Sequence, residues 1–353
     1  MSVAANETAA VRKGEELNAE RLEPYLRELL PNEGDGFEIR QFPGGHSNLT
    51  YSVRVGARDL VLRRPPFGSH VKSAHDMGRE YTILSAIGDR YPYAPKVLDY
   101  CQDESVLGAK FYVMDRIPGV VLRREKPAGW NASPQTVRDI CRNFVRALVD
   151  LHAVDWKAAG LESLQKEGHF MERQVLGWEK RYYGSQTDEI AGVQEVFDWC
   201  KAELPPDVGA VLIHNDFKFD NVLLGPDDLT RIVGVLDWEM STIGDPLFDL
   251  GVAIGYWVNR EGDKGIDVTR GFLTREPGAI TRQEFVDLYG ELRGRDVSDM
   301  HYYYVFALIK LAVVIQQIYY RYATGKTSDE RFAPMIMGVK VLTDRAREVI
   351  ESG

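Results

Sequence analysis

A short polar string near the middle of the chain, His214-Asn-Asp-Phe-Lys-Phe-Asp-Asn221, most constrains what this sequence can fold into. It places a carboxylate at Asp216 and an amide at Asn221, and a second carboxylate, Asp237, ends an apolar run sixteen positions later. In this spacing one carboxylate can orient a hydroxyl nucleophile and accept its proton, while the amide oxygen and the second carboxylate ligate Mg²⁺. Because Mg²⁺ shares its ligand shell with phosphates and water, the pattern predicts a site for magnesium and a nucleoside triphosphate.

The sequence before residue 117 differs in character from the rest. An amphipathic helix at 15–30 is followed by short β-type runs with short turns, which favour an antiparallel sheet. A helix at 74–87, with apolar residues on one face, interrupts these runs. The five predicted strands are 37–42, 50–55, 59–64, 96–100 and 110–116.

Beyond residue 117 the apolar spacing is mostly helical, apart from a β-rich stretch at 211–238 that carries the polar string. The sequence therefore predicts an α+β fold of two lobes, a small antiparallel-sheet N-lobe (1–117) and a larger helical C-lobe (118–353), with the ligand cleft between them. The predicted helices are 134–153, 171–183, 190–203, 246–258, 281–290, 298–324 and 329–351.

Composition excludes several classes of protein. The 43 basic and 53 acidic residues give a formal net charge of −10, and no dense basic run is present, which argues against a nucleic-acid surface. The three cysteines lack Cys-x-x-Cys spacing and no secretory segment opens the chain, so we expect a cytoplasmic protein with reduced thiols. Lys310 and Arg321 interrupt the apolar stretch 302–322, which we interpret as a buried helix and not as a membrane span.

Together these motifs resemble the aminoglycoside phosphotransferase and choline kinase-like family of the protein-kinase-like superfamily. The resemblance runs from about residue 37 to residue 251 and is strongest to bacterial phosphotransferases similar to the kinase-like domains of acyl-CoA dehydrogenase fusion proteins. It implies a bilobal protein-kinase-like fold that uses ATP and Mg²⁺. The roles that the resemblance implies are Asp216 as the catalytic base, Asn221 and Asp237 as magnesium ligands, His214 holding the catalytic loop, and Lys218 steadying the moving phosphoryl group.

The turn between the first two strands is the candidate phosphate-binding loop. Gly44, Gly45 and Ser47 would let backbone N–H groups approach the β- and γ-phosphates. A glycine pair between two strands is also what an ordinary hairpin requires, and the sequence leaves both interpretations open.

Two further segments of the small lobe are expected to contact the nucleotide. Arg63 stands on the third strand where the protein-kinase pattern has a lysine, and Glu80 in the following helix is its expected ion-pair partner. Arginine keeps the charge, but its reach and planarity differ from those of lysine. The segment 113–117, with Met114 and Arg116, resembles the linker whose backbone groups meet the adenine edge.

The segment 244–251 matches the family's Gly-Asp-Pro-x-x-Asp-Leu-Gly signature. We expect Asp245 and Asp249 to cap helix starts and to hold the catalytic loop in place by accepting N–H bonds. A further set of side chains could line an acceptor pocket or simply pack in the core, and the sequence does not decide between the two: Trp178, Arg181, Tyr182 and Tyr183.

The predicted reaction is transfer of the ATP γ-phosphoryl group to a hydroxyl of a small molecule. Only seven residues separate Asp237 from Asp245, too few for a peptide-docking loop. From residue 308 to 353 seven basic residues outnumber five acidic ones, which argues weakly against a polycationic acceptor. An uncharged or anionic hydroxylated metabolite fits no worse than a cationic one, and a hydroxyacyl thioester is one such acceptor by analogy with the fused kinase-like domains.

Two other functions remain open from the sequence: a non-catalytic nucleotide-binding or scaffold protein, and a protein kinase. The expected partners are ATP and a hydroxylated small molecule, with no nucleic acid and no membrane. The sequence does not indicate an oligomeric state.

Overall fold

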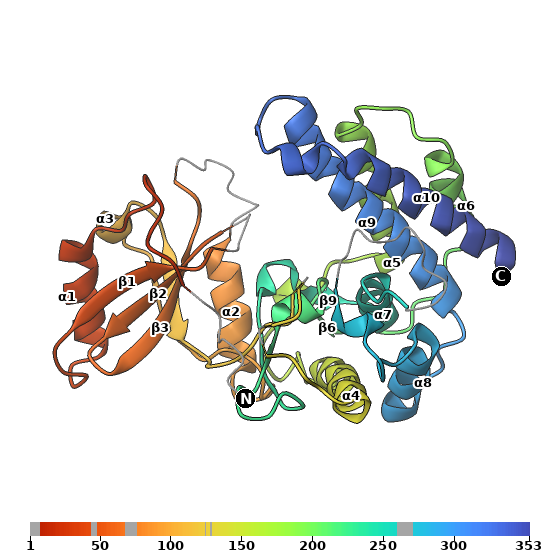
Figure 1. The fold of residues 1–353 in the computed structure, drawn as a ribbon. Coiled ribbons are helices and arrows are strands. Elements are labelled where there is room, and N and C mark those ends of the chain that lie inside the picture. Colours follow the sequence, from red (N-terminus) through yellow and green to blue (C-terminus); the bar gives the residue numbers. More distant parts are fainter. Residues whose placement is uncertain (1–7, 44–47, 68–75, 124, 128, 260–270) are drawn as a thin grey trace.

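The structure is a computed structural model. It describes residues 8–43, 48–67, 76–123, 125–127, 129–259 and 271–353. Figure 1 shows a smaller lobe built on one sheet and a larger lobe built mainly from helices. The small lobe is drawn in red and orange, so it comes from the first third of the chain. This arrangement confirms the predicted α+β fold with its antiparallel sheet.

Five strands form the sheet of the small lobe, all antiparallel, in the order β1-β2-β3-β5-β4. Successive residues of β3 enter different cores: Leu60 and Leu62 pack on one side, whereas Val61 belongs to the core that continues into the large lobe. This period-two burial is the pattern from which strands were predicted. The strands are β1 (Phe37–Gln41), β2 (Leu49–Val55), β3 (Arg58–Arg64), β4 (Val97–Cys101) and β5 (Phe111–Asp115).

One helix packs in each of these two cores. Helix α1 (Ala19–Leu29) buries Leu22 and Leu26 with the outer side of the sheet. Helix α2 (Met77–Ile87) buries Ile83 in the core that is shared with the large lobe. Figure 1 accordingly shows α2 on the side of the sheet that faces the large lobe.

The helix starts that differ most from the predictions are those of the first and last helices, and one short helix was not predicted. The first helix starts four residues late because the Asn18 side chain caps it. The last helix, α10 (Met335–Ser352), starts later than predicted because a 3₁₀ turn precedes it. The short helix α3 (Glu104–Leu107) was not predicted, although Asp103 caps its start and Gly108 ends it with a left-handed φ of 75°.

Helix α9 (Met300–Ala323) lies at the centre of the large lobe and packs against α5, α6, α7 and α10. Among the described residues it is the one helix long and apolar enough to cross a membrane, and 72% of its most apolar window is buried inside the protein. The prediction of a buried helix is therefore confirmed. The other long helices of this lobe are α4 (Pro134–His152), α5 (Phe170–Gly184), α6 (Val193–Ala202), α7 (Pro246–Gly255) and α8 (Arg282–Arg293).

Two short hairpins carry the polar string and the second carboxylate. Strand β6 (Val211–Ile213) pairs with β9 (Thr242–Gly244), and β7 (Val222–Leu224) pairs with β8 (Ile232–Val235), both antiparallel. Residues 214–221 connect β6 to β7, and Asp237 follows β8. Figure 1 shows this region between the sheet of the small lobe and the helices of the large lobe.

Candidate active site

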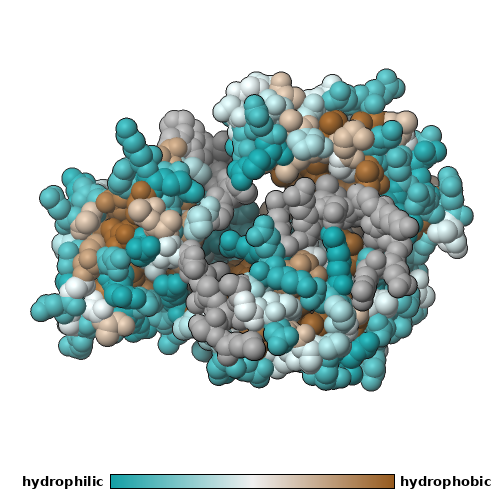
Figure 2. Space-filling view, viewed as in Figure 1, coloured by the Kyte–Doolittle hydropathy of each residue, from teal (hydrophilic) through white to brown (hydrophobic). Residues whose placement is uncertain are grey.

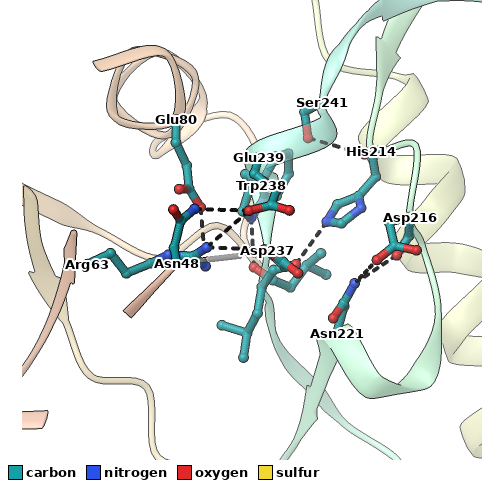
Figure 3. A network of polar contacts seen from close by, with 12 residues as sticks. Asn48, Arg63, Glu80, His214, Asp216, Asn221, Asp237, Trp238, Glu239 and Ser241 are labelled. Atoms are coloured by element: carbon teal, nitrogen blue, oxygen red, sulfur yellow. Dashed lines mark hydrogen bonds and ion pairs between the residues drawn. The ribbon is translucent and has the colours of Figure 1, made fainter. Parts of the chain in front are cut away.

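The loop from residue 214 to residue 221, the 214–221 loop, is joined directly to the segment after β8. His214 Nε2 lies 2.9 Å from the carbonyl oxygen of Leu236, and the Leu236 N–H donates to the Asn221 carbonyl at 2.7 Å. The carbonyl can only accept, so the imidazole carries its proton on Nε2. These two bonds hold Asp237, the next residue, beside the loop, as Figure 3 shows.

Asp216 lies inside a small polar cluster. The Asn221 amide donates to the Asp216 carboxylate at 3.0 Å and to the Asp216 carbonyl at 2.9 Å. Lys218 Nζ lies 2.8 Å from the same carboxylate oxygen, Oδ2. Because both amide bonds use the Asn221 nitrogen, the amide oxygen of this residue points away from Asp216 (Figure 3).

The charge state of Asp216 follows from this cluster. Burial acts to raise the pKa of the Asp216 carboxyl, but the ammonium groups of Lys218 and Lys310 and the hydrogen bond from Lys218 outweigh it, and the pKa lies below its usual value. The pKa of Lys218 is raised, because Tyr256 and Asp216 outweigh its burial. At neutral pH the pair is therefore a carboxylate and an ammonium.

A network of buried hydrogen bonds holds the start of the 214–221 loop. The Asp249 carboxylate accepts the His214 N–H at 2.8 Å and the Asn215 N–H at 2.6 Å. His152 Nε2 lies 3.1 Å from Asp249, and its Nδ1 lies 2.7 Å from the Tyr289 hydroxyl. The predicted support by Asp249 is thus confirmed.

The helix-capping prediction holds for only one of the two aspartates. Asp245 caps α7, since its side chain accepts the N–H groups of Leu247 and Phe248. Asp249 lies inside α7 and caps no helix, so that part of the prediction is wrong for it. It is fully buried, and its oxygens are used by the loop and by His152 instead.

Arg63 connects the two lobes. Its Nη1 lies 3.3 Å from Glu80 on α2, which confirms the predicted ion pair. Its Nη2 lies 3.2 Å from Asp237 Oδ1 and 3.8 Å from Glu239, contacts that were not predicted (Figure 3). Burial alone would lower the pKa of Arg63, but Glu80 and the other anionic groups raise it, so the guanidinium stays charged.

The turn that follows Asp237 is also held by the small lobe. The Asn48 side chain donates to Glu239 at 3.0 Å. On α2, Arg79 donates to the Glu239 carbonyl at 3.1 Å and to the Ser241 carbonyl. The backbone around Asp237 is thereby bound to the sheet lobe on one side and to the 214–221 loop on the other.

A pocket lies between the lobes beside this network, and Figure 2 shows the surface hollowed between them. The Arg116 N–H donates to the Asp59 carbonyl at 3.1 Å, so it already has an acceptor within the small lobe. Gly44, Gly45 and Ser47 lie outside the described residues, and their contact with phosphates stays a prediction. The predicted site residues that line the pocket are Arg63, Glu80, Met114, Arg116, Asn221 and Asp237.

The donors in this pocket fit a magnesium nucleotide. Asn221 and Asp237 each present side-chain oxygen, the ligand type that Mg²⁺ prefers, and both line the same cavity. Among the described residues no group of three or more His, Cys, Asp or Glu side chains is placed to hold a metal ion. A magnesium ion here would therefore take its other ligands from phosphates and water, as it does in nucleotide sites.

Some contacts of the candidate site lie where the sequence gave no signal. Lys310 on α9 reaches Asn215 at the start of the loop, 95 residues away in the chain. The sequence did not decide whether four side chains line an acceptor pocket or pack in the core, and the structure separates them into two groups. Trp178 and Tyr182 are buried and the Arg181 guanidinium lies 4.7 Å from the Trp178 ring centre, whereas Tyr183 is 44% exposed.

The sequence is similar to a known protein family and to known proteins. A sequence model of the phosphotransferase enzyme family matches residues 38–285. Acyl-CoA dehydrogenase family member 10 of Mus musculus is 33% identical over 327 residues, which are 91% of this chain and 30% of that protein. The chain thus spans less than a third of that relative's length.

Solved structures share the fold. A Ralstonia eutropha JMP134 protein, named as a candidate aminoglycoside phosphotransferase, superposes with a TM-score of 0.78 at 26% identity and covers 94% of this chain and 99% of that one. A thermostable mutant of aminoglycoside phosphotransferase APH(4)-Ia, in a ternary complex with AMP-PNP and hygromycin B, gives a TM-score of 0.59 at 17% identity, with 94% and 98% covered. The kinase-like arrangement of a sheet lobe and a helical lobe is common to all three chains.

Proposed function

Because the chain belongs to the phosphotransferase enzyme family, we propose that it transfers the γ-phosphoryl group of ATP to a hydroxyl group of a small molecule. One observation carries the proposal. Asn221 and Asp237 line the interlobe pocket that Arg63 enters from the other lobe, and the Asp216 carboxylate is hydrogen-bonded to the Asn221 amide.

In the proposed reaction the acceptor oxygen bonds to the γ-phosphorus, the bond from that phosphorus to the β–γ bridging oxygen breaks, and ADP leaves. Asp216 orients the acceptor hydroxyl and takes its proton. A carboxyl with a lowered pKa is a weak base, so Asp216 acts mainly by orientation until the oxygen–phosphorus bond has begun to form. Such late proton transfer suits a loose phosphoryl-transfer transition state.

The other residues of the cluster have separate roles in this proposal. Asn221 and Asp237 would hold Mg²⁺, which when bound neutralises charge on the phosphates. Lys218 keeps Asp216 ionised and can reach toward the transferred group. Arg63 holds phosphate oxygens with its planar fork, while Glu80 keeps the guanidinium in place.

The charges around Asp216 favour an uncharged or anionic acceptor. Lys218 and Lys310 both act on Asp216, and Arg181 in turn acts on Lys310. A polycationic acceptor would meet like charge there. We propose a hydroxyacyl thioester, because a relative that this chain resembles is named as an acyl-CoA dehydrogenase family member.

Two competing functions are weaker. In a non-catalytic nucleotide-binding protein, the ion pair of Asp216 with Lys218 and its bond to Asn221 would have no chemical use. In a protein kinase, a peptide-docking segment would follow the metal-binding aspartate. Here a 3₁₀ turn and β9 fill the interval from Asp237 to Asp245.

A screen of ATP consumption by the purified protein tests the proposal. The panel contains hydroxyacyl thioesters, free hydroxy acids, neutral hydroxylated metabolites and aminoglycosides, each with Mg-ATP, and Asp216→Asn is the blank. We expect acceptor-dependent ADP formation with an uncharged or anionic acceptor, and a phosphate ester in the product by mass spectrometry. If Mg-ATP binds but no acceptor raises ADP formation above the blank, the non-catalytic alternative is supported instead.

A further inference from the structure

A buried lysine in the centre of the large lobe contacts the 214–221 loop. Lys310 lies on α9, is 6% exposed, and donates from Nζ to the backbone carbonyl and to the side-chain oxygen of Asn215, both at 2.9 Å. The ammonium also lies 5.5 Å from the ring centre of Trp178 and 5.4 Å from that of Phe248. A lysine is rarely buried to this extent without a defined partner, and its partner here is the residue before Asp216.

Asn215, the residue that Lys310 contacts, has an unfavourable backbone conformation. Its φ of 68° is left-handed, which costs a non-glycine residue free energy that surrounding contacts must offset. The Asn215 N–H donates to Asp249, its carbonyl and Oδ1 accept from Lys310, and its Nδ2 donates to the Met240 carbonyl at 3.3 Å. Of these partners Lys310 alone contacts Asn215 both at the backbone and at the side chain.

We propose that Lys310 is a positioning residue for Asp216: it holds Asn215 in the left-handed conformation that aims the Asp216 carboxylate at the acceptor hydroxyl. The proposal rests on the proposed phosphotransfer and adds a residue, far away in the chain, on which the reaction depends. Lys310 touches neither acceptor nor nucleotide in this account and acts through Asn215.

Lys310 can lose its charge without losing its hydrogen bonds to Asn215. The charged groups that face it are Asp216 and Lys218 from the loop, Asp249 from α7, and Arg181 from α5. Burial outweighs the two carboxylates and lowers the pKa of Lys310 to about 8. A neutral amine still has two N–H donors for the two Asn215 oxygens, so deprotonation removes the charge and leaves the geometry.

The test compares Lys310→Met with Gln316→Met. Gln316 lies on the same helix, is fully buried, and donates to the Ser185 carbonyl at 2.7 Å and to Thr187 Oγ1 at 3.0 Å, away from the 214–221 loop. The readouts are Mg-ATP affinity and the turnover of Mg-ATP with water as the acceptor. We expect Lys310→Met to lower turnover about tenfold or more with affinity within about twofold, and Gln316→Met to leave both within about twofold.

The wild-type enzyme supplies a second measurement that does not depend on the folding of a variant. Turnover at saturating Mg-ATP should not fall as pH rises through about 8, the pKa of Lys310, because the neutral amine keeps both hydrogen bonds to Asn215. Lys310→Arg, which keeps N–H donors at this position, should retain more turnover than Lys310→Met.

The outcomes separate this inference from the function on which it rests. A folded Lys310→Met with wild-type turnover, or turnover that falls through about pH 8 in the wild type but not in Lys310→Arg, would overturn the positioning role of Lys310 while leaving phosphotransfer intact. A wild-type protein that binds Mg-ATP and never turns it over, with water or with any acceptor, would overturn the proposed function, and this inference with it.

Discussion

Two residues of the described chain other than glycine have a left-handed backbone, and both belong to the candidate site: Asn215 with φ 68° and Asp237 with φ 67°. Asparagine and aspartate tolerate this region better than other non-glycine residues do. Their presence therefore allows the left-handed conformation but does not predict it. Each is held by contacts from elsewhere: Asn215 by Asp249 and Lys310, and Asp237 by Arg63. Strain of this kind is typical of functional sites.

The clearest test at the scale of the residue concerns Arg63. Arg63→Ala should raise the KM for Mg-ATP about tenfold or more, because it removes the charge and leaves Glu80 buried without its partner. Arg63→Lys should keep part of the activity, because the charge remains although the fork is lost. The matched control is Arg54→Ala, which removes an exposed ion pair with Asp59 on the same sheet. An unchanged dependence of turnover on ATP in Arg63→Ala would show that Arg63 does not contact the phosphates.

At the scale of the element, α7 supports the loop that precedes β7. The Asp249 carboxylate on this helix accepts two backbone N–H groups of the loop, and its pKa is lowered because His152, His214 and these bonds outweigh its burial. Asp249→Asn would place an amide N–H₂ against one of the two donors. We expect a loss of about 3 kcal/mol in the free energy of unfolding, measured by chemical denaturation at neutral pH. The exposed Asp287→Asn on α8 should change it by less than about 0.5 kcal/mol, and an equal loss in both variants would contradict the role of Asp249.

The elements differ in how well the sequence predicts them. The five strands were placed to within a residue or two because alternation and short turns are local signals. The short spacing from His214 to Asn221 identified the loop for the same reason. Two contacts of the site join distant parts of the chain: Lys310 with Asn215, 95 positions apart, and Arg79 with Ser241, 162 positions apart. Sequence periodicity cannot predict contacts of this kind. They exist only because tertiary packing brings α9 and α2 to the 214–221 loop and to the turn after β8.

At the scale of the whole molecule, both lobes contribute to the interlobe pocket. Its walls include residues of β3, α2 and β5 from the small lobe and the segments around β7 and β8 from the large one. A bound Mg-ATP would therefore contact both lobes and stabilise their arrangement.

This arrangement predicts a thermal shift that depends on magnesium. At about a hundredfold excess over Kd, Mg-ATP should stabilise the protein by roughly 2.7 kcal/mol and raise Tm by several degrees. Asp237→Ala should abolish most of the gain, whereas Asp227→Ala, which removes an exposed carboxylate from the β7–β8 turn, should keep it. A shift of the same size with and without Mg²⁺ would contradict the assignment of Asn221 and Asp237 as ligands.

The most direct measurement compares Mg-ATP binding with turnover per bound nucleotide in the wild type and in Asp216→Asn. The substitution keeps the shape of the side chain and removes the proton acceptor, and Asp216 is assigned to the acceptor hydroxyl. The account predicts that Kd for Mg-ATP changes by no more than about twofold while turnover falls roughly a hundredfold or more, the range for loss of a positioned base. Loss of ATP binding in Asp216→Asn with normal turnover per bound nucleotide would contradict it.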